Sequence, residues 1–368
     1  MYLDHHAGTP LADAAREAMR AAAEEAWANP SSPHRAGRRA RAHAARARRC
    51  VASGLGAAPA DLVFTGGGTE ACNLMVLGGP RPSRVVTTVA EHPAVIRACE
   101  AWAAEGVELR RLPLPGGRAP APEVVEAMLG AGVLFAFQWV NHETGTRLPA
   151  AEWTALARAR GARVVVDASQ ALGRLPVDVT ALGADAVAVA APKIGGPAGA
   201  GALWIRRDSP VQPRELGGSQ ERGRRAGSPD VLALAGFGGA AEALPARLAA
   251  MERIGAWRDR LEARLRALGG VVNGAAGPRV ASAVNASFRG WRGPELVAAL
   301  DLEGLQASAG AACSAGLDAP SEVLLGMYPE EPWRASSCLR LSLGPEGLDE
   351  GSIDAAEAAL ARVIPRGR

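Results

Sequence analysis

The sequence predicts an α/β fold, in which a mainly parallel seven-stranded sheet forms a large domain and a smaller α+β domain accompanies it. Three observations carry this prediction. Short apolar segments alternate with helical patterns through the first part of the chain, which is typical of a parallel sheet covered by helices. The pattern then changes to a charged helix with a few strands. The chain has 368 residues, which is long for a single compact layer.

Seven segments are expected to form the large sheet because each is short, mainly apolar and bounded by helical or turn-forming residues; they are residues 62–65, 84–88, 107–112, 133–139, 163–167, 185–190 and 202–205. Helices are expected between them, for example over residues 93–105 and 150–160. A long charged helix is predicted from about Leu244, and further strands near residues 283–288 and 338–343. We therefore predict a large domain over residues 16–250 and a small domain formed by residues 1–15 and 251–368.

Composition narrows the class of protein. The net charge is +3 and 48% of the residues are hydrophobic, as in a globular enzyme. The basic cluster from Arg35 to Arg49 lacks interleaved aromatic residues, so we interpret it as a solvated helix face and expect no direct nucleic-acid partner. No apolar stretch reaches the length of a membrane span and no leader pattern opens the chain, which predicts a cytoplasmic protein.

The five cysteines show neither a metal-ligand spacing nor a disulfide framework. We expect reduced thiols and no metal site. Four of them lie in apolar patterns, where a free cysteine is usually a small buried residue. Cys313 differs because it lies in a run of small residues, 307–316, which predicts an exposed loop.

Lys193 is the only lysine in the chain, whereas 40 cationic positions are arginine. Arginine keeps the charge but cannot supply a nucleophilic amine, which Schiff-base chemistry requires. Lys193 also follows one apolar strand pattern and opens a glycine-rich turn before the next. A solvated lysine is uncommon in such a place, so we interpret Lys193 as a candidate catalytic amine.

Two further strand ends hold candidate ligand-binding residues. Residues 64–70 pass from a strand through glycines into a helix, where free backbone N–H groups and the hydroxyl of Thr69 can hold a phosphate. Asp167 ends the strand at 163–167, where a buried carboxylate needs a partner such as a cofactor pyridinium nitrogen. A helix N-cap is the alternative interpretation of Asp167.

The order of these motifs resembles the cysteine desulfurases of the NifS/IscS type, which are pyridoxal-phosphate enzymes of the class V aminotransferase group and of fold type I. The resemblance spans nearly the whole chain. It rests on the glycine turn, Glu91-His92, residues 141–145 and 167–170, Lys193, and on further matching segments at 2–4, 9–10, 29–32, 34, 37–38, 220–223, 308–314 and 339–344.

The resemblance implies a role for each matching residue. Lys193 would attach the cofactor and move protons, and Cys313 would take sulfur from L-cysteine as a persulfide, leaving L-alanine. His92 would stack on the cofactor ring. The cofactor-binding set would be Gly68, Thr69, His92, His142, Asp167, Gln170, Lys193 and Ser228, the last from the partner subunit of a homodimer. Arg340 and Asn141 would bind the substrate. A sulfur-acceptor or scaffold protein, as in iron–sulfur cluster assembly or another sulfuration pathway, is the implied partner.

Some positions depart from the family pattern. Residues 190–193 read Ala-Ala-Pro-Lys where the family usually has Ser-x-His-Lys, and His142 replaces an asparagine beside the cofactor ring. Two alternatives therefore stay open. One is another pyridoxal-phosphate enzyme of the same fold, such as a selenocysteine lyase, a β-lyase or an aminotransferase. The other is a degenerate homologue without catalytic activity.

Overall fold

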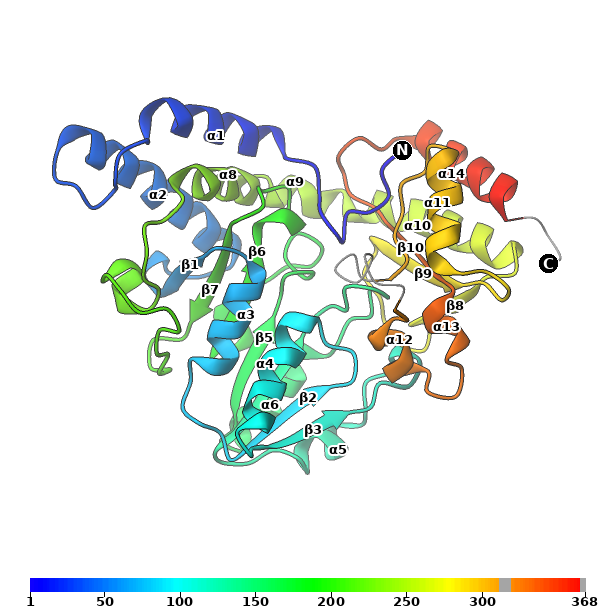
Figure 1. Ribbon diagram of the computed structural model, residues 1–368, viewed down its shortest axis with the longest axis horizontal. Helices are drawn as coiled ribbons and strands as arrows, with labels where there is room; N and C mark the ends of the chain where they lie inside the picture. The colour runs from blue at the N-terminus through cyan, green and yellow to red at the C-terminus, as the bar shows by residue number, and fades with distance from the viewer. Residues whose placement is uncertain (311–318, 365–368) are drawn as a thin grey trace.

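The computed structural model describes residues 1–310 and 319–364 of the chain. Its main feature is a seven-stranded sheet with the strand order β1-β7-β6-β5-β4-β2-β3 (Figure 1). β7 pairs antiparallel with both of its neighbours, and the remaining pairs are parallel. The strands are β1 (Leu62–Thr65), β2 (Arg84–Thr88), β3 (Glu108–Leu112), β4 (Val133–Gln138), β5 (Arg163–Asp167), β6 (Ala186–Ala190) and β7 (Gly201–Ile205).

Helices cover both faces of this sheet because its central strands are apolar on both sides. On one face, α3 (Gly68–Leu77) and α4 (Pro93–Ala104) pack against side chains such as Leu134 and Val165. On the other face, α2 (Arg35–Gly54), α6 (Ala150–Ala159) and α8 (Val231–Glu242) surround Phe135, Phe137 and Val166. The mainly parallel α/β fold predicted from the sequence is confirmed.

A second body holds a three-stranded antiparallel sheet of β10 (Cys338–Ser342), β9 (Ala283–Ser287) and β8 (Val271–Asn273). Its own core lies between this sheet and the helices α10 (Met251–Ala267), α11 (Gly293–Leu302) and α14 (Glu350–Val363). Leu3 from the chain's start belongs to the same core. Figure 1 shows this body beside the large sheet, with the first residues running between the two.

The remaining helices are α1 (Asp13–Glu25), α5 (Pro122–Glu126), α7 (Val179–Leu182), α9 (Leu244–Ala249), α12 (Glu322–Met327) and α13 (Trp333–Ser336). The helix predicted from Leu244 is divided into α9 and α10, which meet at Ala250. β8 was not predicted, because a three-residue strand carries too little pattern to be recognised. Among the described helices, none combines the length and apolarity that a membrane crossing requires.

Candidate active site

A cavity of about 240 Å³ opens where strand ends of the large sheet face the second body. It brings together eight residues that the sequence singled out, from segments more than 200 residues apart. They are Gly68, Thr69, His92, His142, Asp167, Gln170, Lys193 and Arg340. This placement agrees with the general rule that ligands bind outside the carboxyl ends of strands in α/β sheets.

Lys193 reaches this cavity from a short turn. β6 ends at Ala190, and a 3-10 turn over Ala191–Lys193 follows it. The ammonium group of Lys193 donates a hydrogen bond to the backbone carbonyl of Ala7, with Nζ and O 2.6 Å apart. The only lysine therefore points its amine into the cavity, against the N-terminal segment.

One end of the cavity is built from backbone and small side chains. Helix α3 begins at Gly68, and the N–H groups of its first turn have no carbonyl partner within the helix. A Cβ on Gly68 would lie 2.9 Å from the Cβ of Ala190, so only glycine fits between the helix start and β6. Thr69 adds a hydroxyl-bearing side chain to the lining. This end can hold an anion.

Asp167 and Gln170 form the wall beside it. Asp167 ends β5, is nearly buried, and accepts a hydrogen bond from the backbone N–H of Ser169 at 2.9 Å. Gln170 donates from Nε2 to the carbonyl of His6 at 2.8 Å. Its Oε1 is buried and has no hydrogen-bond partner among the described residues. A ligand with a hydroxyl group could satisfy this oxygen.

The rings of His92 and His142, which both line the cavity, are in edge-to-face contact with centroids 5.0 Å apart. His92 is also the N-cap of α4, since its Nδ1 accepts the N–H of Ala94 at 3.1 Å. The side chain of His92 therefore both caps α4 and lines the cavity. Burial lowers the pKa of both imidazoles, that of His142 well below its usual value, so His142 is neutral near pH 7.

Arg340 lies at the other end, in the middle of β10, and is only 1% exposed. Its Nη2 donates to Oδ1 of Asp4 at 2.5 Å, and its Nη1 donates to the carbonyl of His142 at 3.0 Å. Its Nε has no hydrogen-bond partner in the described part of the chain. A buried guanidinium with an unsatisfied N–H facing a cavity is suited to bind a carboxylate.

Two predicted residues, Asn141 and Ser228, are absent from the described lining of this cavity, and a third is not described. Asn141 uses its amide inside its own loop, accepting from the N–H groups of Glu143 and Thr144 and donating to the carbonyl of Ala90. Ser228 lines a separate hollow near Phe64 and Gly66. Cys313 lies outside the described residues. The roles of these three residues stay predictions.

The residues of the lining without a predicted role include His6, Ser169 and Gln138. His6 is fully buried, with its ring nitrogens 3.3 Å from the carbonyl of His142 and 3.2 Å from the hydroxyl of Ser282. Ser169 lies next to Gly68, and Gln138 ends β4. Ser169 and Gln138 both stand at or just after a strand end, which is the signal that could have identified them.

Comparisons with known proteins agree with this geometry. Residues 1–351 match the family described as aminotransferase class-V. The chain is 40% identical to an IscS-like cysteine desulfurase from Mycobacterium tuberculosis, with all of this chain and 97% of that protein covered. Among solved structures, a NifS-like protein superimposes with a TM-score of 0.90 at 27% identity over 99% of this chain and 98% of that one. A structure described as SspA in complex with cysteine gives a TM-score of 0.80 at 26% identity over 94% of this chain and 99% of that one.

Proposed function

This chain belongs to the class-V aminotransferase family, and from that premise we propose that it is a cysteine desulfurase that uses pyridoxal phosphate to remove the sulfur of L-cysteine. The observation that carries the proposal is one cavity lined by Lys193, Asp167 and Arg340. An amine, a buried carboxylate and a buried guanidinium are the groups required to attach the cofactor, to balance its ring nitrogen and to bind an amino-acid carboxylate. The 40% identity to an IscS-like cysteine desulfurase supports the choice of reaction.

The residues of the cavity fit pyridoxal phosphate. The phosphate would lie on the first turn of α3, at Gly68 and Thr69. The ring nitrogen would face the carboxylate of Asp167, and the ring face would lie against His92. The unpartnered Oε1 of Gln170 would accept a hydrogen bond from the ring hydroxyl. When bound, this cofactor withdraws electrons from the substrate's Cα and so makes bond cleavage there and at Cβ possible.

Three side chains of this protein would carry out the remaining steps. Asp167 would hold the proton of the ring nitrogen, since a carboxylate stabilises a nearby cation. The amine of Lys193, once released, would accept and return a proton at the substrate carbon. Arg340 would bind the substrate carboxylate and so fix which end of the amino acid faces Lys193.

Cys313 is the proposed nucleophile. Its thiolate would attack the substrate sulfur, forming an S–S bond while the C–S bond breaks and leaves its electron pair on the substrate carbon, which takes up a proton to give alanine. Ser308, five residues earlier in the chain, exchanges two backbone hydrogen bonds with Arg340. The chain therefore passes directly beside the carboxylate-binding arginine shortly before the nucleophile, which supports this assignment.

The persulfide would then pass to an acceptor protein, in iron–sulfur cluster assembly or another sulfuration pathway. We further propose a cytoplasmic homodimer in which Ser228 of each chain completes the phosphate site of the other. Ser228 supports this because it lies in a hollow of its own chain and outside the lining of the Lys193 cavity.

The proposal is tested by loading the purified protein with pyridoxal phosphate, adding L-cysteine, and measuring alanine and sulfide under reducing conditions. The two products are expected in equal amounts. Lys193→Arg is the matched control, because arginine occupies every other cationic position of this chain and keeps the charge but not the nucleophilic amine. We expect this variant to lose at least about a thousandfold in rate. Sulfide with pyruvate in place of alanine would identify a β-lyase instead, and no reaction with wild type would indicate a non-catalytic homologue.

A further inference from the structure

The N-terminal segment places a carboxylate on the guanidinium that the proposed function gives to the substrate. Oδ1 of Asp4 lies 2.5 Å from Nη2 of Arg340, which is the shortest of the two side-chain contacts described for this arginine. We infer that Asp4 is an internal competitor for the substrate carboxylate and so determines how tightly the site binds carboxylates. This inference rests on the proposed function, in which Arg340 binds that group.

The geometry of the guanidinium explains why the competition is direct. A carboxylate usually binds arginine through two neighbouring N–H groups. The two edges that offer such a pair are Nε with Nη2 and Nη1 with Nη2. Asp4 already holds Nη2, and the carbonyl of His142 holds Nη1. Nε has no hydrogen-bond partner among the described residues but is buried, so a substrate gains a bidentate contact with Arg340 only by sharing or taking Nη2.

Charge adds to this geometric competition. Two carboxylates that share one guanidinium repel each other, and the repulsion is strong where the surroundings exclude water. Arg340 is almost completely buried and the side chain of Asp4 is 18% exposed, so water screens this repulsion only in part. The presence of Asp4 should accordingly weaken the binding of an amino acid but not the binding of an amine that lacks a carboxylate.

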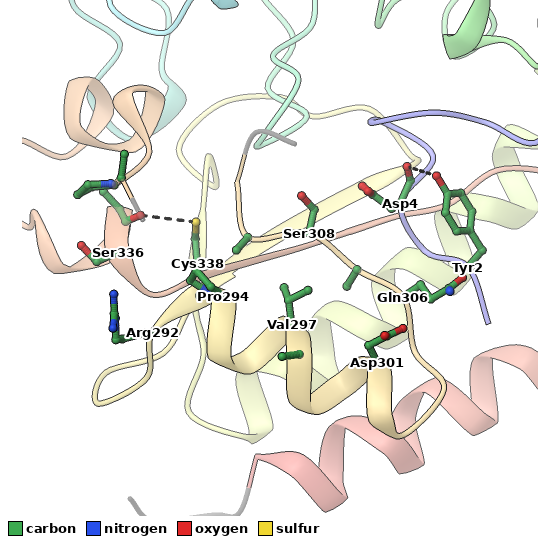
Figure 2. A pocket seen from close by; sticks show the side chains of 17 residues that line it. Tyr2, Asp4, Arg292, Pro294, Val297, Asp301, Gln306, Ser308, Ser336 and Cys338 are labelled. Carbon is green, nitrogen blue, oxygen red and sulfur yellow. Dashed lines mark hydrogen bonds between the residues drawn. The ribbon is translucent and has the colours of Figure 1, made fainter. Parts of the chain in front are cut away.

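Asp4 has a place to move when it is displaced. Asp4 lines a second cavity, of about 600 Å³, whose described lining does not include Lys193. Figure 2 shows Asp4 at the edge of this cavity beside Tyr2 and Ser308, so a displaced carboxylate has open space there. The backbone of Asp4 stays fixed, because its carbonyl accepts from the hydroxyl of Tyr2 and from the N–H of Ala7. Only the side chain has to rotate.

The experiment titrates the cofactor-loaded protein with L-alanine and with ethylamine in a calorimeter. Ethylamine is L-alanine with the carboxyl group replaced by hydrogen. Asp4→Asn keeps the size of the side chain and an acceptor oxygen for Nη2 but removes the charge. We expect this substitution to lower the dissociation constant of L-alanine about tenfold and to leave that of ethylamine unchanged. In turnover, the KM for L-cysteine should fall while kcat changes by less than about twofold.

Asp301→Asn is the matched control, because Asp301 also lines the second cavity and has no described contact with Arg340. It should change neither dissociation constant. Asp4→Ala is measured beside Asp4→Asn, so that a folding defect in one variant does not decide the result. The inference is overturned if both Asp4 variants bind L-alanine no more tightly than wild type, or if ethylamine gains as much as L-alanine. The titrations do not require turnover, so they test Asp4 even if L-cysteine proves not to be a substrate.

Discussion

The two ends of the Lys193 cavity are built in different ways. The end at α3 consists of backbone N–H groups, glycines and the small side chains of Ala190 and Pro192. The opposite end consists of polar side chains that already have partners: Arg340 donates to the carboxylate of Asp4 and to the backbone carbonyl of His142, and the ring of His142 contacts Gln138. The first end relies on the fold to place its donors, whereas the second relies on side chains brought together from distant segments. The α3 end should therefore bind its ligand more tightly when a polar side chain is added. Ligand binding at the Arg340 end should instead respond to changes in charge.

The largest of these effects is expected at the α3 end. Ala190→Ser combined with Pro192→His restores two side-chain donors near the phosphate position, and a hydrogen bond to a charged group contributes about 1.5–3 kcal/mol. We expect pyridoxal phosphate to bind more than about tenfold more tightly and to survive dialysis longer than in wild type. Equilibrium dialysis with absorbance detection of the cofactor measures this.

The same double variant should leave the dissociation constant of L-alanine unchanged, because Arg340 lies at the opposite end. If cofactor affinity does not rise, the backbone donors and Ser228 of a partner already satisfy the phosphate. If the variant changed the dissociation constants of pyridoxal phosphate and of L-alanine by the same factor, the two ends of the cavity would not be independent.

A second effect, on stability, is expected from the layer behind the polar end. Glu91 is buried, accepts a hydrogen bond from the N–H of Gln138 at 2.7 Å, and contacts the hydroxyl of Thr88. Burial raises the pKa of Glu91 to about 8 in the folded protein. Because this is above the value of 4.5 for an exposed glutamate, the folded state binds the proton more tightly than the unfolded state. The stability that Glu91 contributes is therefore complete below pH 4.5 and is lost as the pH rises through 8.

Glu91→Gln should remove this dependence, since glutamine resembles the protonated acid at every pH. The variant should gain on the order of 4 kcal/mol in unfolding free energy relative to wild type between pH 5 and pH 8.5. Urea denaturation at the two pH values measures the gain. Parallel stability curves for the two proteins would show that Glu91 is ionised in the folded protein.

The sequence was sufficient for those features that depend on local pattern. All seven strands of the large sheet were predicted to within a residue or two, because most of them are short apolar runs bounded by turns; β3 is the exception, with three charged residues. The Lys193 turn and the glycine start of α3 were recognised for the same reason. β8 was missed because it has only three residues.

The contacts of Arg340 could not be predicted, because they join Asp4, His142 and β10 across more than 300 residues of sequence. A single sequence shows which side chains are present but not which long-range partners they meet. The same limit applies to His6, whose ring lies between His142 and Ser282. The inward use of the Asn141 amide depends on the loop conformation, which the residue types alone do not specify.

The central claim is that sulfur leaves L-cysteine by attack of Cys313 at a cofactor held by Lys193. The most direct measurement is alanine formation by Cys313→Ser in a single turnover, with the visible absorbance of the cofactor recorded in the same sample. Serine is nearly isosteric with cysteine, but its hydroxyl is not ionised at neutral pH. The account predicts an unchanged cofactor spectrum, a normal spectral response to L-cysteine, no persulfide and almost no alanine. Undiminished alanine formation by this variant would contradict the account and favour another reaction of the same fold.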